Sequence, residues 1–444
     1  MKTTDHRLLW KSLIKYFLFV VISMGIIYDA SRIIYYLNPQ NIYHKDFLQD
    51  YLMSKAVING VNPYLSSVEL AKRLLGINTT INLHPSPHTP FIPFVVLPLS
   101  IINYKLSIVL WLILEISVLI FSVFYLFKKS KISYSFYQLL LIFSLFFLWY
   151  PVQDEFILGQ FTLIQLLMLL FARRLLLNKN YYTAGILIGL AVLIKPFLWP
   201  MVLLFLIWKN WRALFASIAT LLTGFTISFI AIGTNKIIPY FFKILPSINY
   251  LYKDLFTNIS LFSLGTKFFL ASFYNFRWDA NGYLKSTILP LYYLPDLGTI
   301  INFILPILVL LIAFLYLKNT KNHDMGFGLM ICVSILISPV SWYTYLSLLI
   351  IPAFQLLEWL FLHKFPKFET RFLVLLALLF FWVDPLLLLS TYLSIYKINV
   401  QNPNLNLSFV TALFSTIPTI LLIILIFFIT KLKFNKEYTE DIIT

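Results

Sequence analysis

Long apolar stretches dominate this chain and constrain its fold more than any other feature. The clearest of them approach or exceed the roughly 20 apolar residues that a helix needs to cross the hydrocarbon core of a bilayer. They occupy residues 13–36, 106–127, 133–150, 161–177, 213–233, 297–317, 342–362, 372–395 and 408–430. Only 12% of the 444 residues are charged, whereas soluble proteins carry about 25%. The sequence therefore predicts a polytopic membrane protein and excludes a soluble or disordered one.

Shorter or proline-interrupted apolar stretches lie at 91–103, 182–208 and 325–338. Together with the long ones they predict an all-α bundle of about 12 transmembrane helices. Residues 1–444 are expected to form a single integral membrane domain. Two long polar segments, 37–90 and 234–296, interrupt the apolar pattern. We expect both to be loops on the outer face of the membrane.

The formal net charge of +16 comes from basic residues in short runs between the apolar stretches. On a soluble protein this charge would suggest a nucleic-acid partner, but between membrane helices such runs mark cytoplasmic loops, so no nucleic-acid partner is expected. The runs are Lys11/Lys15, Lys128/Lys129/Lys131, Arg173/Arg174, Lys209/Arg212, Lys318/Lys321, Lys364/Lys367 and Lys431/Lys433/Lys436. Placing both termini in the cytoplasm puts most of the runs inside and both polar segments outside.

The topology of 91–103 and 182–208 is open at this point. If 182–194 and 196–208 each cross the membrane, then 91–103 is a re-entrant or half-buried piece. If 182–208 is one bent helix, 91–103 crosses instead, and two basic runs move outside. The charge distribution favours the first arrangement. Both arrangements keep the two polar segments on the outer side.

Rare polar residues near the membrane edge are the best candidates for chemistry. The first polar segment contains Asp46 and Asp50, one helical turn apart, and His84 and His88 just before an apolar stretch. Two carboxylates and two histidines are the components of an acid–base site. The competing interpretation is an amphipathic interfacial helix with a solvated acidic face.

A second candidate is Lys195, which precedes Pro196 inside an apolar stretch. A charge at membrane depth is costly and usually functional or paired, although a snorkelling lysine at a helix break is the alternative. Asp29 and Arg32 in the first stretch are expected to neutralise each other. The sequence contains no phosphate-binding loop, dinucleotide-binding glycine turn or metal-binding His/Cys motif. It therefore indicates no certain cofactor, shows no binding loop for a soluble nucleotide, and does not require a divalent metal.

Asp46 and Lys195 belong to an ordered set of motifs between residues 40 and 345. The set comprises Asp46-Phe47…Tyr51…Ala56…Gly60…Pro63-Tyr64, Pro87…Pro90…Pro93, Gly159-Gln160-Phe161-Thr162, Ala184-Gly185…Gly189-Leu190-Ala191…Lys195-Pro196, Asn258-x-Ser260-Leu261 and Ser338-Pro339-x-Ser341-Trp342. In order and spacing it resembles glycosyltransferase family 87. That family consists of multispanning GT-C enzymes related to the mycobacterial polyprenyl-phosphomannose-dependent mannosyltransferases.

The resemblance implies a GT-C-like bundle and a membrane glycosyltransferase of the cell envelope. Such an enzyme would move a hexose, expected to be mannose, from a polyprenyl-phosphate sugar to a glycolipid or polysaccharide acceptor, with inversion. The active site would face outward from the plasma membrane, with both termini in the cytoplasm. Membrane lipids and the two substrates would be its partners.

The resemblance also implies roles for individual residues. Asp46 is expected to be the catalytic base, with Asp50 as the alternative, and the candidates for the donor phosphate are His84, His88 and Lys195. The candidates for binding sugar or acceptor are Asp50, Tyr51, Asn62, Tyr64, Gln160, Asn258, Ser260 and Trp342.

One departure from the family pattern bears on the donor. After the Ser-Trp motif relatives commonly carry one or two histidines, whereas this chain has Tyr343-Thr344-Tyr345. A hydroxyl can donate a hydrogen bond to phosphate but brings no positive charge. Either His84 or His88 then supplies the charge, or the donor site differs.

Two other functions remain alternatives. A transporter or flippase of lipid-linked substrates would carry inverted repeats and polar residues at the membrane midplane, and no convincing repeat is visible. Another lipid-linked glycan enzyme, a polymerase or ligase, tends to place Arg/His-rich motifs in a large outer loop. The segment 234–296 contains no histidine.

Overall fold

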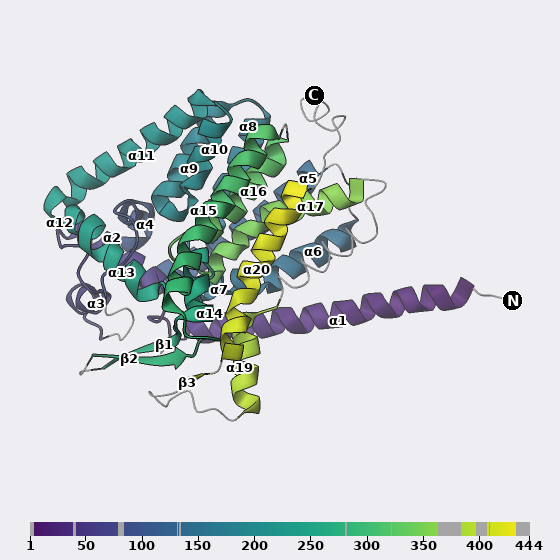
Figure 1. The fold of residues 1–444 in the computed structure, drawn as a ribbon, viewed down its shortest axis with the longest axis horizontal. Helices are drawn as coiled ribbons and strands as arrows, with labels where there is room; N and C mark the ends of the chain where they lie inside the picture. The colour runs from purple at the N-terminus through teal and green to yellow at the C-terminus, as the bar shows by residue number, and fades with distance from the viewer. Residues whose placement is uncertain are drawn as a thin grey trace.

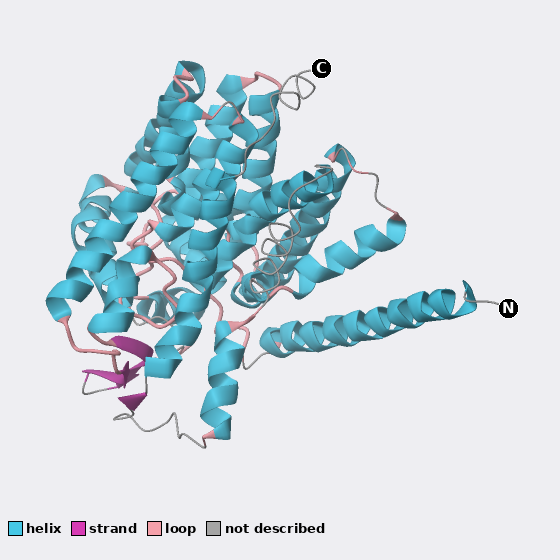
Figure 2. Ribbon diagram, turned by 45° about the vertical axis from the view of Figure 1, so that its right-hand side comes forward, coloured by secondary structure: helices cyan, strands magenta, loops and turns pink. Residues whose placement is uncertain are grey.

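The computed structural model describes residues 4–38, 41–78, 84–130, 132, 135–279, 282–320, 322–362, 383–396, 406–407 and 409–431. Helices dominate it, as Figures 1 and 2 show, so the predicted helical membrane class is confirmed. Within these residues five helical stretches are long and apolar enough to cross a membrane. They are α5 (Tyr104–Lys129), α11 (Trp211–Ile232), α15 (Pro295–Asn319), Tyr343–Leu360 and α20 (Phe409–Lys431).

A sixth candidate span is the pair α6 (Phe136–Leu148) and α7 (Tyr150–Leu158), which is bent by 59°. Pro151, in the first turn of α7, suits a helix that begins anew at this bend. The expected count of about 12 crossings is not confirmed by the described residues, and the predicted span 372–395 lies partly outside them.

The remaining helices are shorter, apart from α1, which leaves the bundle (Figure 1). They are α1 (Thr4–Leu37), α2 (Phe47–Ile58), α3 (Ser67–Leu75), α4 (Ile92–Ser100), α8 (Thr162–Leu177), α9 (Tyr181–Ile194), η1 (Pro196–Leu198), α10 (Pro200–Ile207), α12 (Thr234–Pro239), η2 (Tyr240–Ile244), α13 (Leu245–Tyr252), η3 (Leu261–Ser263), α14 (Leu264–Phe269), α16 (His323–Leu336), η4 (Tyr343–Leu349), α17 (Ile350–Leu362) and α19 (Pro385–Ile395).

A small sheet, which the sequence analysis did not predict, lies within and beside the second polar segment. Strands β1 (Ser272–Asp279) and β2 (Gly282–Ile288) pair antiparallel, and β3 (Asn406–Leu407) pairs parallel to β2. Figure 2 shows the three strands together at one end of the helical bundle.

The packing of α9 against α11 resolves the path of residues 182–208. Gly185 lies against Ala213, Gly189 against Ser217, and Leu193 against Gly224. The residue numbers of the two helices increase in the same direction along this contact, so α9 and α11 run parallel. The connection through η1 and α10 must therefore run back in the opposite direction. Residues 182–194 and 196–208 are two antiparallel pieces rather than one bent helix, as the charge pattern favoured.

Several basic runs gather at one end of the bundle. Arg173 at the end of α8 forms a salt bridge with Asp324, with Nε 2.5 Å from Oδ1. The ring of Trp208 stacks on His323, and Tyr125 near the end of α5 contacts Phe171 of α8. The basic residues at 128–129, 173–174, 209–212 and 318 consequently share this end, which we call the basic end.

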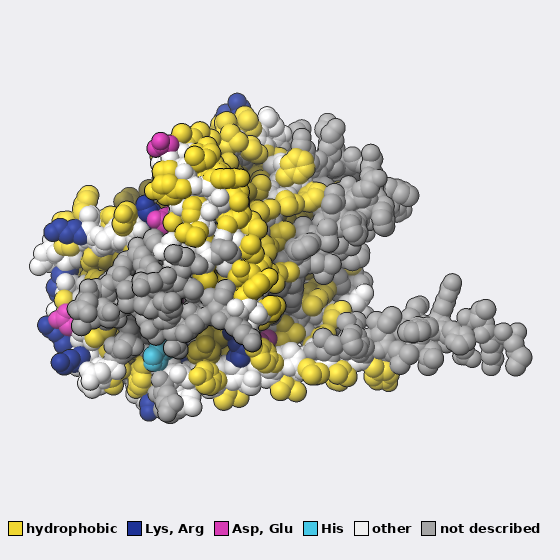
Figure 3. All heavy atoms as spheres, turned by 60° about the horizontal axis from the view of Figure 1, so that its bottom comes forward, with side chains coloured by type: hydrophobic (Ala, Val, Ile, Leu, Met, Phe, Trp, Pro, Cys, Tyr) yellow, Lys and Arg dark blue, Asp and Glu magenta, His cyan; other side chains and the backbone are white. Residues whose placement is uncertain are grey.

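The two long polar segments meet at the opposite end. Lys236 donates a hydrogen bond to the carbonyl of Gly60 over 3.1 Å, and the ring of Tyr240 stacks on Tyr64 with centroids 4.7 Å apart. Figure 3 views this end and shows Lys and Arg side chains at one edge, with hydrophobic side chains over much of the remaining described surface. The two polar segments therefore lie side by side at this end of the bundle.

Candidate active site

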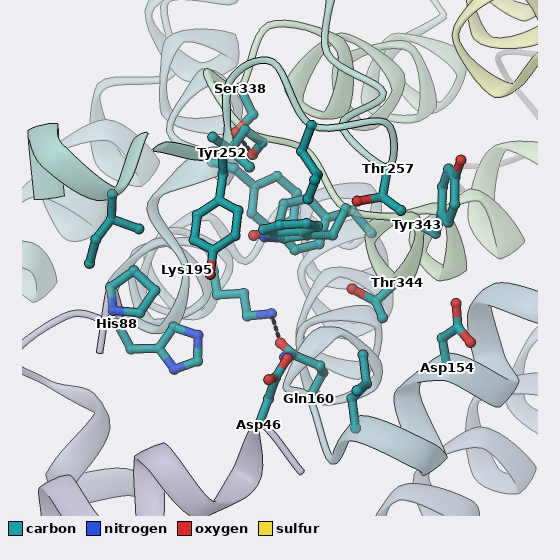
Figure 4. Close-up of a pocket in the computed structure, with 18 of the residues that line it drawn as sticks. Asp46, His88, Asp154, Gln160, Lys195, Tyr252, Thr257, Ser338, Tyr343 and Thr344 are labelled. Carbon is teal, nitrogen blue, oxygen red and sulfur yellow. Dashed lines mark hydrogen bonds between the residues drawn. The ribbon is translucent and has the colours of Figure 1, made fainter. Parts of the chain in front are cut away.

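A cavity of about 970 Å³ lies where the two polar segments meet the helical bundle. Its walls come from α1, the start of α2, residues 84–88, the α7–α8 junction, the turn between α9 and η1, α13 and residues 338–345. Figure 4 looks into it. The predicted site residues that line it are Asp46, His84, His88, Gln160, Lys195 and Trp342.

Local backbone geometry brings three of these side chains to one wall. Asp46 is the N-cap residue of α2, but its carboxylate makes no capping bond and is left for the cavity. Gln160 follows Gly159, whose φ of +71° is readily adopted by glycine. A Cβ on Gly159 would lie 2.8 Å from the Cβ of Phe47, so the close approach of α7 to α2 also requires glycine. Lys195 lies at the turn enforced by Pro196.

A chain of hydrogen bonds joins these three side chains. Gln160 Nε2 donates to Asp46 Oδ2 over 2.5 Å, and Lys195 Nζ donates to Gln160 Oε1 (Figure 4). The ammonium also lies 4.9 Å from the ring centroid of Tyr345, which stacks on Phe197 with centroids 4.0 Å apart. The lysine therefore fixes the orientation of the amide, and the amide fixes the carboxylate.

Asp50 and His88 form a second polar pair. The Asp50 carboxylate contacts Nδ1 of His88, and Asp50 is 1% exposed and does not line the cavity. Burial raises the pKa of Asp50, and the neighbouring His88 acts in the opposite direction. His88 does line the cavity, so Asp50 is placed to orient the imidazole rather than to meet a substrate.

His84 is held as a neutral ring. Its Nδ1 is 2.7 Å from the carbonyl of Pro85, which can only accept, so Nδ1 carries the hydrogen. Its Nε2 is 2.6 Å from the hydroxyl of Tyr252, which donates to the neutral ring. Burial lowers the pKa of His84. At neutral pH this histidine is uncharged, which leaves Lys195 and His88 as the predicted candidates for the donor phosphate.

Three other predicted residues of the first polar segment lie outside the cavity lining. The hydroxyl of Tyr51 donates to the carbonyl of Ile102 over 2.7 Å. Asn62 accepts from the backbone N–H of Tyr64, whose hydroxyl donates to the carbonyl of His88 over 3.2 Å. These side chains support the walls of the cavity.

Asn258 and Ser260 also lie behind the wall. The amide of Asn258 donates to the carbonyls of Lys253 and Pro339, and its Oδ1 accepts from the N–H groups of Ser260 and Ser341. The hydroxyl of Ser260 donates to the carbonyl of Leu336 over 3.3 Å. Asn258 thus joins the second polar segment to the 338–342 segment.

Other lining residues were not among the predicted site residues. Arg32, interpreted from sequence as the partner of Asp29, has its Nη1 4.0 Å from Asp29 Oδ1 but also lines the cavity. Asp154, Tyr252 and Thr344 line it as well. Of these, Asp154 carried a signal in the sequence, because it is an acidic residue beside the Gly-Gln motif. Within the described residues no group of three or more His, Cys, Asp or Glu side chains could hold a metal ion.

The fold and the cavity define an integral, multi-pass membrane protein with a polar site at the end opposite its basic loops. The model of glycosyltransferase family 87 matches residues 87–339, more than half of the chain. The chain belongs to this family and is a membrane glycosyltransferase that uses a sugar donor and an acceptor. No curated protein and no solved structure matches it. The matched range contains His88, Gln160 and Lys195 but begins after Asp46.

Proposed function

We propose that this glycosyltransferase moves a hexose, with mannose as the expected sugar, from a polyprenyl-phosphate donor to a glycolipid or polysaccharide acceptor. The whole chain acts as one membrane domain in the plasma membrane. Both termini lie in the cytoplasm, and the cavity opens at the outer face. The reaction inverts the configuration of the anomeric carbon.

The observation that carries this proposal is the chain from Asp46 through Gln160 to Lys195 on one wall of the cavity. It places a carboxylate and an ammonium in one site, joined by an amide. A base for the attacking hydroxyl and a cation for a leaving phosphate are the two groups that sugar transfer from a phosphate donor needs.

The proposed step is a single displacement. The acceptor oxygen attacks the anomeric carbon and forms the new glycosidic bond, while the bond from that carbon to the phosphate oxygen breaks. Asp46 takes the proton from the acceptor hydroxyl. The leaving polyprenyl phosphate keeps the electron pair, and its charge is stabilised by Lys195 and by His88, which Asp50 orients.

Two further features support an outward-facing site for a lipid-linked donor. The cavity lies at the end opposite the basic loops, which the positive-inside rule places in the cytoplasm. Trp199, in the connection from η1 to α10, lines the cavity and is also 42% exposed. A side chain that contacts both the cavity and the surroundings marks a side entrance through which a lipid tail can leave the site.

The test is turnover of polyprenyl-phosphate sugars by the full-length protein in liposomes. Asp46→Asn should abolish transfer without lowering expression, because an amide cannot accept the proton. Glu69→Gln is the matched control, since Glu69 pairs with Arg73 on α3 away from the cavity. Near-wild-type turnover of Asp46→Asn would refute the assignment.

Two more variants separate the roles on this wall. Asp50→Asn should retain more activity than Asp46→Asn, because Asp50 acts only through His88. Lys195→Met should weaken apparent donor affinity, because the cation for the phosphate is lost. An unchanged donor affinity in Lys195→Met would contradict the phosphate role.

A further inference from the structure

The cavity has a second polar end that the proposed reaction does not use. Asp154 of α7 and Tyr343 and Thr344 of η4 line it on the side away from Asp46 and Lys195 (Figure 4). These residues come from elements far apart in the sequence, α7 and η4, which pack against each other. They therefore form a group separate from the chain of Asp46, Gln160 and Lys195.

The hydroxyl groups at this second end have no hydrogen-bond partner among the described residues. Thr344 is 3% exposed and Tyr343 is 4% exposed. Within the described part of the chain neither Thr344 Oγ1 nor Tyr343 Oη makes a hydrogen bond. Figure 4 shows the Thr344 hydroxyl turned toward the space between the two ends. Because buried hydroxyl groups are nearly always paired, these atoms point to a bound ligand that supplies hydroxyl partners.

The charges around this end select the kind of ligand. Arg32 also lines the cavity, and its Nη1 lies 4.0 Å from Oδ1 of Asp29. Because Asp29 already pairs with this cation, a phosphate or a uronic acid at this end would lie beside the carboxyl group of Asp154 and is disfavoured. Neutral sugar hydroxyls can both donate to the carboxylate and pair with the two free hydroxyl groups.

We propose that Asp154, Tyr343 and Thr344 form the acceptor subsite and that it takes a neutral, hydroxyl-rich sugar. This rests on the proposed function and deepens it, since the opposite wall is left for the phosphate of the donor. The acceptor sugar is held at this end, and one of its other hydroxyl groups is directed toward Asp46. The tyrosine and threonine that replace family histidines after Trp342 thus face the acceptor rather than the donor phosphate.

The kinetic test compares Thr344→Val with Thr344→Ser in liposomes containing a polyprenyl-phosphate sugar. Thr344→Val should raise the KM for a neutral acceptor glycoside by about tenfold, the effect of losing one buried hydrogen bond. The KM for the donor should not change, and Thr344→Ser should restore the acceptor KM. Thr162→Val is the matched control, since Thr162 also has a buried hydroxyl without a partner in the described chain but does not line the cavity.

Direct binding keeps this inference separate from the proposed donor. Saturation-transfer NMR on the full-length protein without donor uses a panel of neutral methyl hexosides and the matching methyl uronides. The wild-type protein should bind a neutral glycoside at least about tenfold more tightly than its uronide, and Asp154→Asn should narrow that preference. If no polyprenyl-phosphate sugar is turned over but this binding pattern holds, the proposed function fails and the subsite stands. Equal binding of both glycosides, no binding of either, or unchanged binding in Thr344→Val would overturn the subsite.

Discussion

At the scale of single residues, the Asp50–His88 pair places a buried carboxylate next to one partially buried ring. Asp50 is 1% exposed, and its second oxygen has no hydrogen-bond partner in the described chain. Removing one partner of a buried pair leaves the other uncompensated, which costs about 3–5 kcal/mol. His88→Ala should therefore lower the free energy of unfolding strongly. Asp50→Asn combined with His88→Ala should cost less than the sum of the two single changes.

Thermal unfolding in nanodiscs measures this double-mutant cycle, and pH adds an independent check. The pKa of Asp50 is already raised above its ordinary value of 3.8, and loss of His88 raises it further. A carboxyl group whose pKa is raised in the folded state lowers the stability of the protein as pH rises from the unfolded pKa through the folded one. The decrease in the free energy of unfolding caused by His88→Ala should therefore be smaller at mildly acidic pH than at alkaline pH. Additive single effects at all pH values would argue against the pairing.

Lys267 of α14 holds the segment that carries Thr257 and Asn258. It is 1% exposed and donates to the carbonyls of Phe256 and Asn258 over 3.1 and 2.5 Å. Burial lowers its pKa from 10.5 to about 7. Between these two pH values the unfolded chain binds more protons than the folded one, so stability rises with pH and is lost as pH falls toward 7.

Lys267→Met should remove this pH dependence, since the methionine cannot titrate. The measurement is the unfolding temperature of both proteins across that range, relative to the surface variant Lys72→Met. A wild-type slope that persists in Lys267→Met would assign the effect to another group.

At the scale of elements, the contact between α9 and α11 sets the position of Lys195. Gly185 and Gly189 are four residues apart, a spacing that lets membrane helices approach closely. A Cβ on Gly185 would lie 2.3 Å from the carbonyl oxygen of Ala213, an impossible contact without movement of the backbone. Gly185→Leu should therefore lower the unfolding temperature and also reduce turnover, since α9 leads into the turn at Lys195.

The control for this prediction is Ile186→Leu. Ile186 is the next residue along the helix, and its side chain is 43% exposed. This variant should unfold and turn over like the wild-type protein. Equal unfolding temperatures for Gly185→Leu and Ile186→Leu would contradict the tight contact.

The helices and strands differ in how well they could be predicted from the sequence. The break at Lys195 could be predicted because Pro196 cannot continue the hydrogen bonding of a helix. The strands β1 and β2 were not predicted, although apolar and polar residues alternate from Phe276 to Asp279 and Asn281-Gly282 favours a hairpin turn. From its motif alone, Asn258 was predicted to bind the sugar or the acceptor. The sequence could not reveal that the side-chain amide of Asn258 makes its hydrogen bonds with backbone groups, those of Lys253, Ser260, Pro339 and Ser341.

At the scale of the whole molecule, the charge distribution and the position of the site both distinguish one end of the helical bundle from the other, and we call this difference the polarity of the molecule. The basic loops lie at one end, and the cavity lies where the two polar segments meet at the other. From Thr162 near the cavity to Leu177 near the basic end, α8 rises about 24 Å, at about 1.5 Å per residue. This is most of a bilayer core of about 30 Å, so the cavity lies near the membrane face opposite the basic loops.

This polarity can be tested by labelling introduced cysteines in intact cells, because the native Cys332 is 0% exposed and should stay silent. Asn59 lies in the first polar segment, whereas Asn178 and Lys209 lie in loops at the basic end, and all three are exposed. With a membrane-impermeant maleimide, Asn59→Cys should be labelled directly. Asn178→Cys and Lys209→Cys should be labelled only after permeabilisation. Labelling of Lys209→Cys but not Asn178→Cys in intact cells would contradict the antiparallel path of α9 and α10, and labelling of both with protection of Asn59→Cys would invert the whole molecule.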